Sequence, residues 1–122
     1  MIVVLDTNFL IDLLKYKIDI REIEGIVGAR CELITLDGVI DELKKIAKSR
    51  KKSSKYAKLA LKLIDFHKIK IIPSPEKNTD KALIFLARNA MIATNDKKLR
   101  KKLKKIGMKT IYLRAKKHLA MG

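Results

Sequence analysis

Four acidic residues of this chain each come shortly after a short apolar run. Asp6 follows the run IVVL directly, and Asp96 follows the run MIAT after one residue. Glu42 comes seven residues after the run ELIT, and Asp80 follows the run IKII across a turn with two prolines. Carboxylate oxygens are the ligands that hard divalent cations such as Mg²⁺ and Mn²⁺ prefer, and such ions keep several waters. The four acids therefore predict an oxygen-ligand metal site.

Each of these acids also has a simple structural interpretation. The triplets DTN at 6–8, NTD at 78–80 and TND at 94–96 resemble helix N-caps, whose short side chains accept backbone N–H bonds. An acid in the first turn of a helix is also favoured by the helix dipole. For any one position, capping is the simpler explanation. Four acids at one sheet edge would repel one another unless a cation lies between them, so the combination favours the metal site.

The elements that must position the acids alternate along the chain. Five apolar, β-branched runs predict strands at 2–5, 32–35, 69–72, 91–94 and 110–113, and segments with helical periodicity lie between them. This alternation predicts an α/β fold with a parallel sheet covered on both faces. Ligands of such sheets bind outside the carboxyl ends of the strands. One crevice at that edge could therefore hold all four carboxylates.

Other acidic, histidine and cysteine residues are weaker candidates for the site. Asp41 and Glu42 are adjacent on a predicted helix, so only one can point into the crevice, and spacing alone does not choose. Asp12 lies inside an apolar helix, where a solvent-facing side chain is favoured over a supporting one. The two histidines and the single cysteine stand apart from one another. We find neither a glycine-rich phosphate loop nor a credible Ser–His–acid triad.

The charge of the chain indicates its partner. The 122 residues include 29 Lys and Arg but only 13 Asp and Glu, which gives a formal net charge of +16. Such a surplus attracts polyanions through counterion release, so nucleic acid is the expected partner. With only three Tyr, three Phe and no Trp, the composition favours phosphate contacts over base stacking. Two basic groups next to the acids are predicted to bind RNA: Lys97, Lys98, Arg100, Lys101 and Lys104 beside the fourth acid, and Lys44 and Lys45 beside the second.

Length and composition limit the organisation of the chain. We expect one domain over 1–122, with a basic C-terminal tail from about 114. No run approaches about 18 apolar residues, so a membrane span is not expected. The amino terminus does not resemble a signal peptide, and one cysteine permits no internal disulfide. A cytoplasmic setting is therefore the default expectation.

The acids and their surroundings resemble the PIN-domain family of ribonucleases. The strand with DTN at 6–8, the segment VIDELKKIA and the segment TDKALIFLARNAMIATNDKKLRKKLKKIGMKTIYLR carry the resemblance, which covers nearly the whole chain in the expected order. The closing TNDKKLRKKLKKIGMKTIYLR is particularly similar to archaeal relatives of the small-subunit rRNA-processing PIN nucleases. It is less similar to the VapC toxins of toxin–antitoxin pairs.

The resemblance implies a three-layer α/β/α fold with a central parallel sheet of about five strands. It implies that Glu42, not Asp41, is the second acid, and that the acids bind one or two Mg²⁺ or Mn²⁺ ions to cut single-stranded RNA. Asn8 and Thr94 match positions that hydrogen-bond the carboxylates or the attacking water. Some relatives carry another acid where this chain has Lys98, which bears on whether a second ion binds.

The predicted function is thus a metal-dependent endoribonuclease that acts in rRNA processing. Three alternatives stay open: a VapC-type toxin held by an antitoxin, a non-catalytic RNA- or ribosome-binding protein, and a structure-specific DNA nuclease. The chain is short for the extra duplex-binding elements of the last class. The resemblance also suggests a homodimer.

Overall fold

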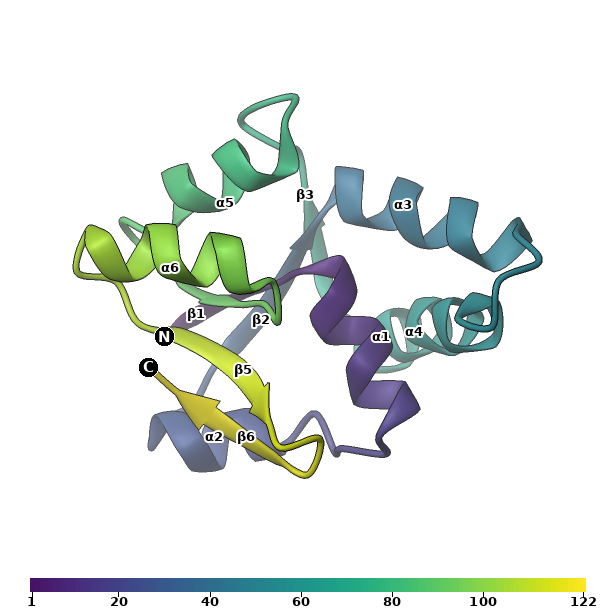
Figure 1. Cartoon of the computed structure of the whole chain (residues 1–122), viewed down its shortest axis with the longest axis horizontal. Helices are drawn as coiled ribbons and strands as arrows, with labels where there is room; N and C mark the ends of the chain where they lie inside the picture. Colours follow the sequence, from purple (N-terminus) through teal and green to yellow (C-terminus); the bar gives the residue numbers. More distant parts are fainter.

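A six-stranded sheet runs through the middle of the molecule, with helices on both of its faces (Figure 1). The structure is a computed structural model that describes all residues, 1–122. The strands are β1 Ile2–Leu5, β2 Glu32–Leu36, β3 Lys70–Ile72, β4 Met91–Ala93, β5 Thr110–Arg114 and β6 His118–Met121. The helices are α1 Thr7–Lys15, α2 Glu22–Val27, α3 Asp37–Lys48, α4 Ser54–Phe66, α5 Thr79–Leu86 and α6 Lys97–Lys105. The predicted α/β fold is confirmed.

The strand order is β3-β2-β1-β4-β5-β6, and the first five strands run parallel. The central strand β1 pairs with β2 on one side and with β4 on the other. Its residues Val3, Val4 and Leu5 are fully buried. This is why β1 reads as an unbroken apolar run, as expected for a parallel strand covered on both faces.

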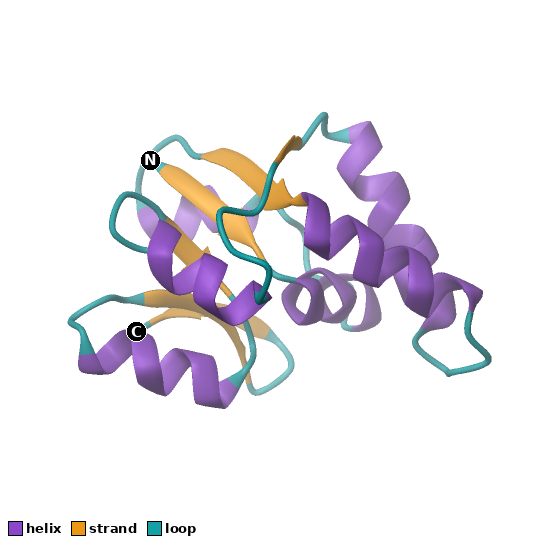
Figure 2. Ribbon diagram, turned by 90° about the horizontal axis from the view of Figure 1, so that it is seen from above, coloured by secondary structure: helices purple, strands orange, loops and turns teal.

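Helices α5 and α6 lie on one face of the sheet, and α1, α2 and α4 lie on the other (Figures 1 and 2). Each helix packs through an apolar stripe. In α1 the buried side chains include Phe9, Leu10 and Leu13, and in α6 they are Leu99 and Leu103, one turn apart. No helix of the structure is long and apolar enough to span a bilayer.

The order of the strands creates a switch point between β1 and β4. From β1 the chain moves outward to β2 and then β3, and it returns to place β4 on the other side of β1. The connections therefore leave β1 and β4 in opposite directions, which opens a crevice at their carboxyl ends. Asp6 directly follows β1, and residues 94–96 directly follow β4.

The C-terminal residues differ from the prediction. From about residue 114 we expected a basic tail, but β6 pairs antiparallel with β5 and closes that edge as a sixth strand. Ala115 and Lys116 both have positive φ angles, 53° and 58°, and the N–H of Lys117 donates to the carbonyl of Arg114. The register pairs Arg114 with His118, so residues 115–117 form a tight three-residue hairpin turn with two residues in the left-handed region. Because the turn lacks Gly and Asn, the sequence carries no usual signal for it.

Candidate active site

Asp6 is held at the centre of the switch point. Its backbone N–H donates to the carbonyl of Ala93 at the end of β4, and its Oδ1 accepts from the N–H of Thr7 at 2.8 Å. The side chain thus caps α1, as the capping interpretation expects. The capping bond occupies only one of the two carboxylate oxygens. Asp6 is 6% exposed, so the second oxygen lies in a nearly closed environment.

Thr94 joins that second oxygen to the other strand. Its hydroxyl donates to Oδ2 of Asp6 at 2.8 Å and accepts from the backbone N–H of Asp96 at 3.2 Å. Thr94 is fully buried. One hydroxyl therefore connects the acid that follows β1 with the segment that carries the acid after β4.

Burial raises the pKa of Asp6 from 3.8 to about 6. The hydrogen bonds from Thr94 and Thr7 lower the pKa but do not cancel the effect of burial, and the charges of Glu42 and Asp80 raise it further. A carboxylate that is both buried and close to other carboxylates is costly to ionise in the absence of a cation. Such strongly perturbed acids are typical of functional sites.

Glu42 and Asp80 face Asp6 from α3 and α5. Of the two adjacent acids in α3, Glu42 is the one whose charge figures among the main influences on Asp6. Asp80 lies half-buried in the first turn of α5, where Asn78 provides the cap by accepting from the N–H of Lys81. Neither the Glu42 nor the Asp80 carboxylate accepts a hydrogen bond from the protein. Both carboxylates are therefore free to bind water or a ligand.

Asp96 is tied to its own helix. Its Oδ1 accepts from the N–H groups of Lys98 at 2.9 Å and Leu99 at 3.3 Å, so it caps α6. Its other oxygen, Oδ2, accepts no hydrogen bond from the protein. Asp6 and Asp96 therefore share one arrangement, in which one oxygen caps a helix at the crevice.

Asn95, which was not among the predicted site residues, supports this arrangement through three hydrogen bonds. Its Nδ2 donates to Oδ2 of Asp12 at 2.9 Å, its Oδ1 accepts from the N–H of Leu113, and its own N–H donates to Oδ1 of Asn8. Asn8 thus bonds the backbone after β4. The expectation that Asp12 faces solvent is wrong, because its side chain is half-buried against Asn95. The sequence signal for this role of Asn95 is its place as a polar residue between Thr94 and Asp96.

The four acids have no basic partner. The structure contains one ion pair, between Arg21 and Asp19 on the surface, although the chain has 29 Lys and Arg. No three Asp, Glu, His or Cys side chains are grouped closely enough to hold a metal ion by themselves. The all-oxygen set still fits a hard divalent cation, since Mg²⁺ is typically held by one or two carboxylates and keeps several waters. The fit is therefore to an ion bound partly through water.

The predicted RNA-binding residues fall into separate places. Four of the five in α6 line one pocket with Tyr112 and Gly122: Lys97, Arg100, Lys101 and Lys104. Lys98 is exposed on the same helix and lies outside that pocket. Lys44 lies in another hollow, between α3, α4 and β3, and Lys45 is exposed on α3. The structure thus groups the basic residues of α6 and leaves the two of α3 apart from them.

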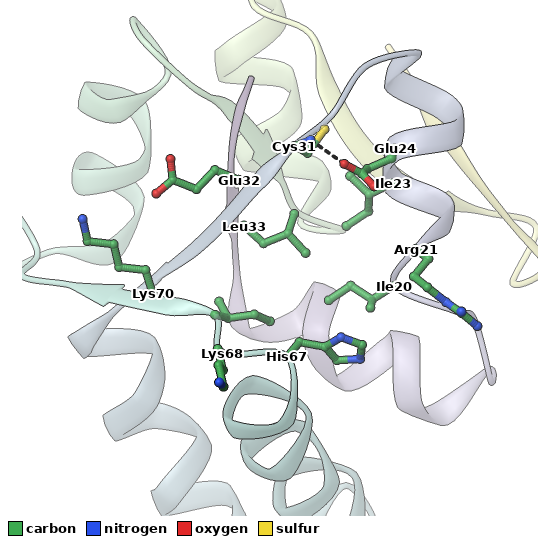
Figure 3. A pocket seen from close by; sticks show the side chains of 11 residues that line it. Ile20, Arg21, Ile23, Glu24, Cys31, Glu32, Leu33, His67, Lys68 and Lys70 are labelled. Carbon is green, nitrogen blue, oxygen red and sulfur yellow. Dashed lines mark hydrogen bonds between the residues drawn. The ribbon is translucent and has the colours of Figure 1, made fainter.

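A further pocket of about 320 Å³ lies at the amino ends of β2 and β3, the opposite end of these strands from the acids (Figure 3). Cys31 and His67 both line it, and the N–H of Cys31 donates to Glu24 at 2.7 Å. Burial, and then the charge of Glu24, raises the pKa of the Cys31 thiol. A thiol held in its protonated form is a poor nucleophile, so this pocket lacks the chemistry of the acid crevice.

The fold and the acids define a class of protein. Residues 3–116 match the family described as PIN like domain, and the chain belongs to this family. The chain is 34% identical over 122 aligned positions to Ribonuclease VapC4 of Methanocaldococcus jannaschii, with 95% of this chain and 92% of that relative covered. The predicted membership of the PIN family is confirmed.

Two solved structures share the fold. The PIN domain endonuclease Utp24 superimposes with a TM-score of 0.80 at 24% identity, over 98% of this chain and 90% of that one. A domain of a functionally unknown protein from Methanocaldococcus jannaschii gives a TM-score of 0.65 at 20% identity, over 93% and 91%. At these identities the likeness concerns the fold alone.

Proposed function

We propose that this protein is an endoribonuclease that hydrolyses RNA phosphodiesters with the help of Mg²⁺ or Mn²⁺. The observation that carries the proposal is the buried Asp6 carboxylate, which faces Glu42 and Asp80 at the switch point with no basic residue to neutralise it. A cation and a phosphodiester would supply the missing positive charge and the reacting group. The name of the VapC4 relative, a ribonuclease, supports RNA as the substrate.

Asp6 and Asp96 are the residues that would hold the ion directly. Each uses one oxygen as a helix cap. Oδ2 of Asp96 accepts no bond from the protein, and Oδ2 of Asp6, which accepts the Thr94 hydroxyl, keeps a second lone pair for the ion. Asp80 and Glu42 would act through water, because no three acids are grouped closely enough for direct ligation. When bound, such an ion makes water acidic enough to attack at neutral pH and offsets charge on the scissile phosphate.

The protein's own residues would orient the reacting groups. Thr94 fixes Oδ2 of Asp6, and Asn8 and Asn95 fix the backbone that leads to Asp96. Because water attacks and not the ribose 2′-hydroxyl, the products should carry 5′-phosphate and 3′-hydroxyl ends. The basic face of α6 would hold the RNA backbone through its phosphates.

A ribosomal RNA precursor is the proposed target. The support is the likeness of the segment from Thr94 to Arg114 to PIN nucleases that process small-subunit rRNA. The VapC4 relative supports a second candidate, a toxin ribonuclease controlled by an antitoxin. Crosslinking the protein to RNA in cells separates the two: enrichment at pre-rRNA supports processing, whereas enrichment at tRNA or mRNA supports the toxin. A small antitoxin reading frame beside the gene would add to the second.

The chemistry is tested with purified protein and a labelled single-stranded RNA. We expect cleavage with Mn²⁺, none with EDTA, none with the Asp6→Asn variant, and 5′-phosphate ends on the products. A DNA strand of the same sequence should be cut more slowly. Equal or preferred DNA cleavage would favour a DNA nuclease, and cleavage that persists in EDTA would contradict metal dependence.

A further inference from the structure

The pocket beside α6 has features that random surface lysines lack. It has a volume of about 330 Å³ and is lined by Lys97, Arg100, Lys101, Lys104, Tyr112 and Gly122, with no acidic side chain among them. Arg100 and Lys101 each lie three or four positions from both Lys97 and Lys104, so the four basic residues share one face of the helix. Like charges at this spacing destabilise a helix slightly. The arrangement therefore favours an anion in the pocket.

Arg100 is held in place before any ligand arrives. Its guanidinium Cζ lies 3.4 Å from the centroid of the Tyr112 ring, and its Nε–H donates to the Thr110 hydroxyl at 3.4 Å. Thr110 in turn donates to the carbonyl of Gly122 at 3.0 Å. Stacking on the ring and the bond at Nε leave the two terminal nitrogens of Arg100 free. A fixed guanidinium with free terminal nitrogens matches the bidentate recognition of a phosphate.

The pocket starts where the acids end. Lys97 directly follows Asp96, and Arg100 lies four residues beyond Asp96, about 6 Å along the helix axis. Because Arg100 already covers one face of Tyr112, that face is closed to a nucleobase. We propose that this pocket is a subsite for one backbone phosphate of the RNA strand, next to the phosphate that is cut. Arg100 binds the phosphate, and Tyr112 and Thr110 are positioning residues. This inference rests on the proposed function, since it takes RNA as the substrate.

The test measures binding of a short fluorescent single-stranded RNA by anisotropy, in the Asp6→Asn background so that the strand stays intact. Arg100→Ala should weaken binding about tenfold, as expected for a charge-assisted hydrogen bond. It should also lower the slope of log affinity against log salt by about 0.7. The matched control is Lys102→Ala, which removes the same charge from the same helix outside the pocket. Its effect should stay within about twofold. Equal losses in the two variants would overturn the subsite.

Two further experiments test which phosphate of the RNA is bound and whether the Tyr112 ring positions Arg100. Neutral methylphosphonates placed one at a time along an RNA should weaken binding to the protein with Arg100 most strongly at one linkage. That sensitivity should disappear with Arg100→Ala, and its persistence would overturn the proposal. Tyr112→Leu should weaken binding like the loss of Arg100, whereas Tyr112→Phe keeps the ring and should bind normally. Thermal unfolding of each variant separates lost binding from lost folding. Tyr112→Leu that folds and binds normally would contradict the positioning role.

The outcomes distinguish this inference from the proposed function. If the protein cuts RNA but no single methylphosphonate weakens binding in an Arg100-dependent way, the phosphate subsite alone is overturned. If one methylphosphonate weakens binding in an Arg100-dependent way but the protein cuts no RNA, the proposed activity is overturned and the subsite is retained.

Discussion

The hydroxyl of Thr94 lies 2.8 Å from Oδ2 of Asp6, and both residues are buried. The same hydroxyl accepts the backbone N–H of Asp96. One oxygen atom therefore sets the relative position of two acids that the chain separates by 90 residues and the sheet brings together at neighbouring strands. The carboxylate geometry at the switch point depends on this contact.

Replacement of Thr94 with valine should damage the site. Thr94→Val keeps the shape of the side chain but leaves Oδ2 of Asp6 and the N–H of Asp96 without a partner. Unpaired buried groups cost about 1–3 kcal/mol of unfolding free energy. Loss of a bond that orients a metal ligand typically lowers activity about 10–100-fold. Urea unfolding and single-turnover RNA cleavage measure the two effects.

The matched control is Thr35→Val on the neighbouring strand β2. Thr35 is equally buried, and its hydroxyl donates to the carbonyl of Leu5 at 2.7 Å. This variant should lose similar stability while the folded protein keeps cleavage within about threefold, because no acid is unpaired. If both variants lose cleavage equally, Thr94 has only a structural role.

The buried Asp6 should make stability depend on pH. Its pKa is about 6 in the folded protein against 3.8 in the reference state, so the folded protein binds this proton more tightly. The contribution to stability is full below about pH 4 and is lost as the pH rises through 6. The loss amounts to roughly 3 kcal/mol at most. In EDTA, Asp6→Asn should therefore be more stable than the wild type at pH 7, and the two should converge near pH 4. Equal stability at both values would show that the carboxylate is not perturbed.

Asn95 and Asp12 offer a pair that can be exchanged. Asn95→Asp replaces the donor that bonds Asp12 with a second carboxylate, so it should destabilise the fold by about 1–3 kcal/mol at pH 7. Adding Asp12→Asn restores a donor on the other side and should recover much of the loss. Thermal unfolding of the single and double variants measures this coupling. A double variant no more stable than Asn95→Asp would mean that the brace contributes little.

The adjacent acids of α3 provide a comparison within one turn of helix. Glu42→Gln should lower RNA cleavage about 10–100-fold, because this carboxylate faces Asp6 and would orient water at the ion. Asp41→Asn, which removes the same charge from an exposed side chain, should stay within about twofold of the wild type. The reverse order would reassign the second acid to Asp41.

The fold and the acidic positions could be predicted because each rests on local signals. The buried strands β1 and β4 read as apolar runs, and Asp6 and Asp96 follow them directly. The parallel topology alone predicts that these acids lie at the carboxyl edge of the sheet. The choice of Glu42 over Asp41 required the family resemblance, since helix spacing permits either.

Features that depend on contacts between distant segments were not predictable in this way. The support that Asn95 gives to Asp12 and Leu113 joins α1, the end of β4 and β5, and nothing in the triplet TND specifies those partners. Strand β6 was missed because its turn uses Ala115 and Lys116 where Gly or Asn is usual. The stacking of Arg100 on Tyr112 likewise joins a helix and a strand that the sequence separates by a loop.

The central claim is that the acids around Asp6 bind a divalent cation. Measuring the affinity for Mn²⁺ by electron paramagnetic resonance tests this claim without depending on activity. The wild type and the Asp41→Asn control should bind Mn²⁺ with similar affinity. Asp6→Asn should bind at least about tenfold more weakly. If Asp6→Asn binds Mn²⁺ as tightly as the wild type, the ion lies elsewhere and the proposed site is wrong.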